Sequence, residues 1–221
     1  MSRLGQFPPC AVILQLKLSA LSAVYPVMSA SERDTTEFFD RLTNQVLSLR
    51  VLSHQRLRPL NSEQLNRRPA YDKWSAAQCL EHLNIVGGYY LPSLKTNLRL
   101  AQAKGSIAGS QVRSGWLGRY FTETAQKNNG LGDNLLRRPK QFAPTGVRLT
   151  GTVVEAFNRQ LDELLRLLLL ARQVDAGAVR IPNPLYPWLR LRLTDVLEVL
   201  VIHIQRYVKQ AEQVTKEMAS K

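Results

Sequence analysis

The chain has 221 residues and a formal net charge of +13, and hydrophobic residues make up 44% of it. Such a length and composition are typical of one globular domain with a sizeable core, and they exclude a disordered polymer. Basic residues are spread along the chain without interleaved aromatic residues, which favours a solvated basic surface over nucleic-acid binding. The two cysteines form no CxxC motif, so neither a zinc ribbon nor a disulfide framework is indicated.

Residues 1–30 differ from the remainder of the chain. Their apolar segment, residues 11–24, is interrupted by Lys17 and is too short to span a bilayer. We predict an extension outside a domain of residues 31–221, either because translation starts at Met28 or because the extension is disordered. A secretory signal peptide is the third alternative. Since no other segment is long and apolar enough to cross a membrane, we expect a cytoplasmic protein without a membrane partner.

Apolar residues at three- and four-residue spacing predict four helices. The predicted helices cover residues 34–52, 75–104, 152–172 and 194–218. Ser75 with Gln78, and Thr152 with Glu155, fit capping boxes at the second and third of them. No alternating run typical of a strand occurs. The sequence therefore predicts an all-α fold, most simply a four-helix bundle, with a long connection (residues 105–149) between helices two and three.

Two histidines lie inside apolar helices, His82 on the second and His203 on the fourth. A buried imidazole needs a partner, and two imidazoles on separate helices suggest a shared metal ion. The alternative is a pair of core histidines that are hydrogen-bonded inside the bundle. They lie about 10 and 14 Å from the starts of their helices. These similar depths fit parallel helices, and antiparallel packing requires an axial offset. The long connection permits either arrangement, so the sequence leaves the topology open.

Three motifs together resemble the DinB-like family, also called the DinB/YfiT-like metalloenzymes. The first is a Trp-Ser entry to the second helix followed by a histidine, and the second is a proline-rich approach to the fourth helix. The third is a His-x-x-Arg-His-x-x-Gln signature on the fourth helix. These motifs correspond to Trp74, Ser75 and His82, to Asn183, Pro184 and Leu185, and to His203, Arg206, Tyr207 and Gln210. The resemblance extends over nearly the whole chain after Met28.

This resemblance implies a bundle with three histidines around a divalent metal, either Zn, Ni, Mn or Fe. His82 and His203 match two of the family's positions, whereas Tyr207 stands at the third. The phenol has a pKa near 10, so it suits a hard ferric ion better than zinc. Cys79 and Glu81 are alternative third ligands, and Cys79 is favoured because Glu81 points about 100° away from His82 on an ideal helix.

The family further implies a metal-dependent hydrolase or thiol S-transferase that acts on a small molecule. A metal there lowers the pKa of a bound thiol or water. The alternative is a degenerate, non-catalytic bundle that serves as a binding or scaffold protein, with Tyr207 as a core aromatic residue. A nucleic-acid accessory protein is the least favoured interpretation. Catalytic residues and the oligomeric state, including a homodimer, are left open by the sequence.

Overall fold

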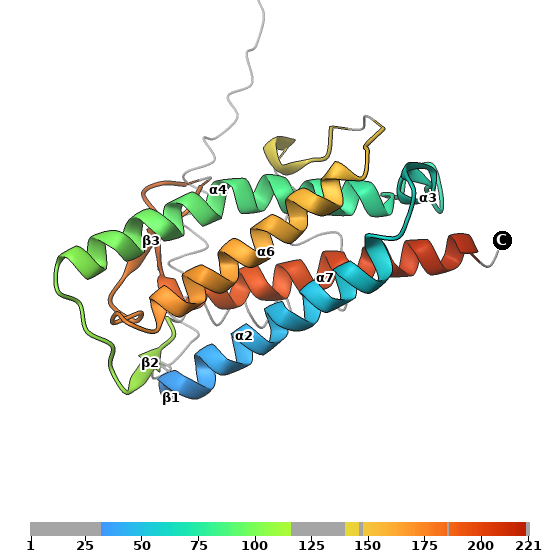
Figure 1. Ribbon diagram of the computed structural model, residues 1–221. Coiled ribbons are helices and arrows are strands. Elements are labelled where there is room, and N and C mark those ends of the chain that lie inside the picture. The colour runs from blue at the N-terminus through green and yellow to red at the C-terminus, as the bar shows by residue number, and fades with distance from the viewer. Residues whose placement is uncertain (1–31, 116–139, 146–147, 185, 220–221) are drawn as a thin grey trace, which may run out of the picture. The chain divides into compact units, whose positions relative to one another are not determined.

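The computed structural model describes residues 32–115, 140–145, 148–184 and 186–219. Among them, four long helices enclose the hydrophobic core, which agrees with the predicted all-α class (Figure 1). The long helices are α2 (Thr35–Leu52), α4 (Ala76–Ala103), α6 (Thr152–Ala171) and α7 (Leu193–Ala219). Helix α4 packs against α6 and α7, and α2 packs against the same two helices. The prediction about residues 1–30 lies outside the described residues.

Short elements connect the long helices. A π-helical turn continues α2, a five-residue helix precedes α4, and a 3-10 turn lies in the connection before α6. These are Ser53–Leu57, α3 (Ser62–Asn66) and Lys140–Phe142. Two antiparallel strand pairs also occur, β1 (Glu32–Asp34) with β2 (Gln111–Arg113), and β3 (Arg180–Pro182) with β4 (Arg190–Arg192). The sequence analysis missed them because three residues are too few to show alternation.

Side-chain caps begin two of the long helices, and the one at α4 is the capping box that the sequence predicts. At α2, the Asp34 carboxylate accepts a hydrogen bond of 2.9 Å from the Glu37 amide. At α4, both bonds of the Ser75–Gln78 capping box are present. Gly105 follows α4 with a φ of 71°, a conformation that glycine adopts without strain. These local signals explain why the predicted and observed boundaries of α2 and α4 agree closely.

The capping box predicted for the third helix is wrong. Gly151 is the residue before α6, and no side chain caps the first turn. The Thr152 hydroxyl lies 2.7 Å from the hydroxyl of Thr150 instead. Because Thr152 is already the first helical residue, its side chain starts one position too late to accept from the amide of Glu155.

Helices α4 and α7 run in opposite directions, which the colours in Figure 1 make clear. The sequence left both arrangements open, and the structure has the antiparallel one with an axial offset. About 24 Å of α7 follows His203, whereas about 9 Å of α4 precedes His82. The end of α7 consequently extends past the start of α4 and packs against α3.

Gly87 is the position where α4 makes room for a side chain of α6. A Cβ atom at Gly87 would lie 2.0 Å from Oε1 of Gln160. The Nε2 of Gln160 donates a hydrogen bond of 2.9 Å to the carbonyl of Asn84. The next residue, Gly88, is exposed and has open space around the same position. Only the first of the two adjacent glycines is thus required by packing.

We expect Gly88→Ala to stabilise the fold by up to about 1 kcal/mol, because alanine has the higher helix propensity. Gly87→Ala should show no such gain. Its methyl group displaces the Gln160 carboxamide and breaks a hydrogen bond worth about 0.5–1.5 kcal/mol. Urea unfolding of the two variants measures the difference directly. Equal stabilisation by both substitutions would show that Gln160 moves aside at no cost.

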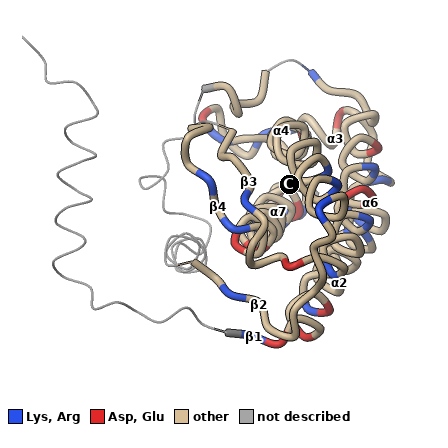
Figure 2. The backbone as a smooth tube through the Cα atoms, turned by 90° about the vertical axis from the view of Figure 1, so that its left-hand side faces the viewer, with Lys and Arg blue, Asp and Glu red and all other residues tan. Residues whose placement is uncertain are grey.

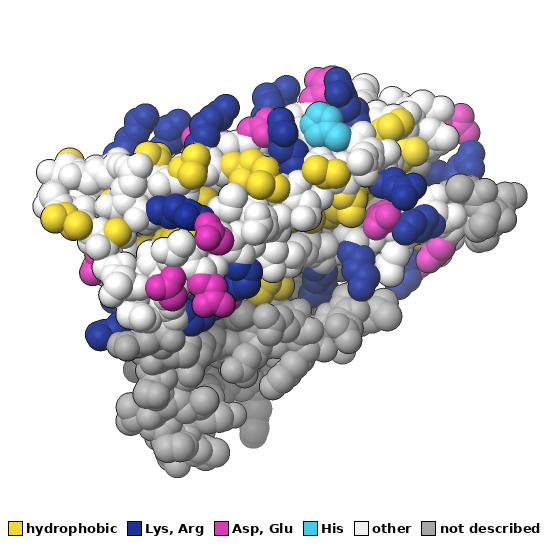
Figure 3. Space-filling view, turned by 60° about the horizontal axis from the view of Figure 1, so that its bottom comes forward, with side chains coloured by type: hydrophobic (Ala, Val, Ile, Leu, Met, Phe, Trp, Pro, Cys, Tyr) yellow, Lys and Arg dark blue, Asp and Glu magenta, His cyan; other side chains and the backbone are white. Residues whose placement is uncertain are grey.

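The surface combines distributed positive charge with a few exposed apolar side chains. Lys and Arg are spread over helices and strands rather than confined to one element (Figure 2). Leu47 and Val51 of α2 are 42% and 53% exposed, and they line a groove of about 640 Å³ together with Glu212 of α7. Figure 3 shows hydrophobic side chains interspersed with Lys and Arg on one face.

None of the helices in the described part of the chain has the length and apolar character that a membrane span requires.

Candidate metal centre

The imidazoles of His82 and His203 meet between α4 and α7. Their Nε2 atoms lie 3.0 Å apart, although 121 positions separate the two residues in the sequence. His82 is only 3% exposed, and His203 is half-buried. The axial offset between the two helices brings these side chains to the same level. The structure thus places the two histidines that the sequence singled out at one site.

A backbone carbonyl determines which nitrogen of His82 carries the proton. Nδ1 of His82 lies 2.6 Å from the carbonyl oxygen of Phe142. Because a carbonyl only accepts, Nδ1 must be protonated and donate this bond. In a neutral imidazole the lone pair then lies on Nε2, which is directed at His203. Metal-binding histidines characteristically donate their second nitrogen to a carbonyl or carboxylate in this way.

The segment that carries Phe142 is held on α4 by neighbours of His82. The Glu81 carboxylate accepts hydrogen bonds from the amide and the hydroxyl of Thr145, at 3.1 and 2.6 Å. The ring of Tyr89 contacts the ring of Phe142 edge-on, with centroids 5.3 Å apart. These contacts fix the carbonyl that orients His82. Glu81 therefore supports the site through Thr145.

Two aromatic residues complete the surroundings of the histidine pair. Tyr207 is 4% exposed, and its ring centroid lies 4.4 Å from that of His82 and 4.8 Å from that of His203. Trp74 stacks on Tyr207, with centroids 5.8 Å apart and planes inclined by 27°. The indole also lies 5.2 Å from the ring of His82. The site is therefore a cluster of four rings, in which Tyr207 touches both imidazoles.

The two facing nitrogens are spaced as two ligands of one metal ion would be. Two nitrogen ligands of a tetrahedral zinc ion lie about 3.3 Å apart, close to the separation of the Nε2 atoms. Across the described ranges, no three His, Cys, Asp or Glu residues are grouped so that they could hold an ion. The expectation that Cys79 or Glu81 supplies a third ligand is therefore not met there. Cys79 is fully buried in the hydrophobic core.

Two carboxylates of α7 form a second polar cluster that the sequence analysis missed. Glu198 is 6% exposed and accepts bonds of 2.8 and 3.0 Å from Arg33 and one of 2.6 Å from Arg41. Burial raises the pKa of Glu198, but the two arginines outweigh burial and lower it. Burial raises the pKa of Asp195, although the amide of Gly115 donates to it at 3.0 Å.

The chain matches a known protein family. Residues 45–211 match the family model of the DinB superfamily. This range covers most of the chain and contains His82, His203 and Tyr207. Neither the curated proteins nor the solved structures gave a match.

Proposed function

The chain belongs to the DinB superfamily, and we propose that it is a four-helix bundle that binds one divalent metal ion. The ligands in this proposal are His82, His203 and Tyr207, and the ion is Zn, Ni, Mn or Fe. The observation that carries the proposal is the orientation of His82. Its Nδ1 proton is used by the Phe142 carbonyl, so its Nε2 lone pair is directed at the second imidazole, 3.0 Å away. A divalent ion satisfies both nitrogens at once.

The reaction that we propose is the hydrolysis of a small molecule or the transfer of a thiol to it. A divalent ion at this site would supply a Lewis acid that makes a thiol or water nucleophilic near neutral pH. Within the chain, the Phe142 carbonyl holds the His82 ring in one orientation. The stacked rings of Trp74 and Tyr207 keep water from that side of the imidazoles.

One observation favours a second candidate, a non-catalytic bundle. A distance of 3.0 Å between two Nε2 atoms is also that of an N–H···N hydrogen bond, in which His203 donates to His82. In that case the pair is satisfied without an ion, and Tyr207 serves as a core aromatic residue. The two candidates differ in one measurable property, which is the binding of metal.

Metal content measured by plasma mass spectrometry tests the proposal. Chelator-treated protein is incubated with each of the four ions, desalted and analysed, beside His82→Ala and His203→Ala. His54→Ala is the matched control, because His54 is exposed on the turn after α2. We expect about one ion per chain in the wild type and the control, and near-complete loss in both site variants. Wild-type protein that retains no ion would overturn the proposal in favour of the non-catalytic bundle.

A further inference from the structure

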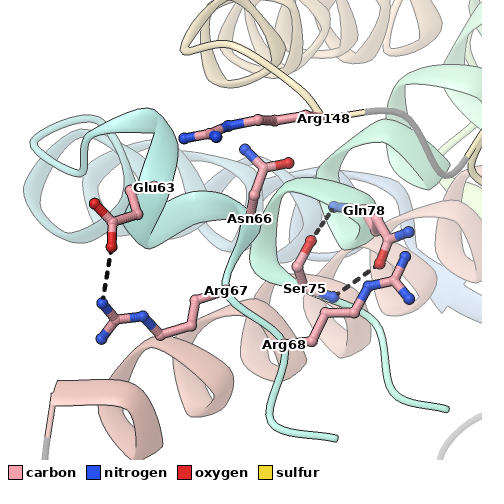
Figure 4. Close-up of a pocket in the computed structure, with 7 residues that line it drawn as sticks. All are labelled: Glu63, Asn66, Arg67, Arg68, Ser75, Gln78 and Arg148. Carbon is pink, nitrogen blue, oxygen red and sulfur yellow. Dashed lines mark hydrogen bonds and ion pairs between the residues drawn. The ribbon is translucent and has the colours of Figure 1, made fainter. Parts of the chain in front are cut away.

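A polar pocket opens beside the start of α4 (Figure 4). Its volume is about 430 Å³, which lies in the range of pockets that hold small molecules. Its lining comes from α3 and the segment after it, from the first turn of α4, and from the segment before α6. The lining residues are Glu63, Asn66, Arg67, Arg68, Ser75, Gln78 and Arg148.

The lining carries an excess of positive charge. Among the described residues that line the pocket, three are arginines and only Glu63 is acidic. Glu63 pairs with Arg67 at 3.2 Å. Within the part of the chain that the structure describes, no carboxylate forms an ion pair with Arg68 or Arg148. The guanidinium groups of Arg68 and Arg148 therefore have no carboxylate partner in the described part of the chain, and a bound anion could neutralise them.

The arginines are brought together by a specific tie between distant segments. The Nδ2 of Asn66 donates to the carbonyl of Leu149 at 2.7 Å, and the Leu149 amide donates to Oδ1 of Asn66 at 2.9 Å. These two hydrogen bonds hold the segment that carries Arg148 against the end of α3. In Figure 4, Asn66 lies between the segment that carries Arg148 and the one that carries Arg67 and Arg68. The spacing of the charges is consequently built into the fold.

The backbone amides of Ser75 and Gln78, at the start of α4, are already used within the helix cap. The Gln78 amide already donates to the Ser75 hydroxyl, and Gln78 accepts in turn from the Ser75 amide. The charged donors at the pocket are therefore the guanidinium groups. Gln78 precedes His82 by four positions, so both lie on one face of α4, about 6 Å apart along its axis. The pocket thus adjoins the histidine pair along the helix.

We propose that this pocket binds a doubly charged oxyanion group of a small molecule, either a phosphate monoester or a pair of carboxylates. Guanidinium groups match the oxygens of both groups through paired, charge-assisted hydrogen bonds. That this molecule is the substrate of the histidine site rests on the function proposed above. The anion site itself requires no metal, so the two proposals fail separately.

The test is calorimetric titration of the full-length, chelator-treated protein with inorganic phosphate and, separately, with succinate. Arg68→Gln and Arg148→Gln each remove one charge from the pocket. Arg99→Gln removes the same charge from an exposed position on α4 and is the control. We expect saturable binding of at least one probe, weakened about tenfold or more by either pocket variant and unchanged by the control. The probe that binds more tightly identifies the group.

Three outcomes would overturn the proposal. One is the absence of saturable binding of both probes. Another is an equal loss of affinity in Arg99→Gln, which would show a response to total charge alone. The third is tighter binding of a single-stranded oligonucleotide than of phosphate, with an affinity that the pocket variants reduce. The arginines would then contact a phosphodiester backbone. Because metal is absent in every titration, none of these results depends on ion binding at His82.

Discussion

Glu198→Ala is expected to lower the free energy of unfolding by about 2–3 kcal/mol. The substitution removes three charge-assisted hydrogen bonds from a nearly buried carboxylate. It leaves the positive charges of Arg33 and Arg41 without their partner. The expected loss is smaller than the roughly 3–5 kcal/mol of a fully buried pair, because the arginine side chains are still 31% and 39% exposed. Urea unfolding, followed by circular dichroism, measures the change.

The chain provides a matched control for this substitution at Glu163. That carboxylate also accepts from two cations, Lys95 at 3.1 Å and Arg166 at 3.0 Å, but its side chain is 26% exposed. Solvent screens such a pair, so Glu163→Ala should cost only about 0–1 kcal/mol. Similar losses in the two variants would mean that the burial of Glu198 adds nothing to its ion pairs.

The same Glu198 variant also reports the pH dependence of stability. The folded chain holds the pKa of Glu198 below its usual value, so its contribution is present above about pH 4.3 and is lost as the pH falls through the lower folded pKa. Wild-type stability should therefore fall more steeply on acidification than that of Glu198→Ala. Asp195 acts in the opposite direction. Its raised pKa disfavours the folded state above that pKa, and protonation relieves this cost.

Tyr207→His is expected to raise the affinity for a divalent ion by at least the ~10–100-fold that a supporting outer-shell group is worth. The Tyr207 ring contacts both imidazoles, so an imidazole at the same position faces the same point between them. With His203 it forms a pair at i and i+4 on one helix face, and the site gains a third neutral nitrogen ligand. Competition for zinc with a chromogenic chelator measures the affinity.

Tyr207→Phe is the companion variant, because it keeps the ring and removes only the hydroxyl group. If the phenol oxygen is a ligand, Tyr207→Phe should bind the ion more weakly than the wild type and Tyr207→His more tightly. Circular dichroism establishes that both variants are folded. An affinity unchanged in both would place the ion, if bound, away from residue 207, and the proposed ligand set would be wrong.

Much of the helical framework could be predicted because its signals are local. The Ser75–Gln78 box and the apolar spacing give α4 its start and its buried face within a few residues of sequence. A third ligand for the proposed ion could not be predicted in the same way. Its identity depends on which side chains of distant elements converge, and Cys79 proved to belong to the hydrophobic core.

The second polar cluster and the partner of His82 carried weaker signals. Asp195 and Glu198 stand inside an otherwise apolar stretch of α7, and a carboxylate in such a stretch indicates a buried partner. Reading the sequence in that way would have predicted the cluster, although not Arg33 and Arg41 as its members. The hydrogen bond from His82 to residue 142 had no signal at all, because every residue has a carbonyl and only the folded chain selects one.

The bond from His82 to the Phe142 carbonyl couples the position of a connecting segment to the electronic state of the site. While residues 140–145 rest on α4, the nitrogen that faces His203 bears a lone pair. Were that segment to lift from Glu81 and Tyr89, Nδ1 would lose its acceptor, and the proton could pass to the opposite nitrogen. Nε2 of His82, which faces His203, would then change from an electron-pair donor to a hydrogen-bond donor. A movement of the main chain would thereby remove the lone pair that the proposed ion requires, while both histidines stay in place.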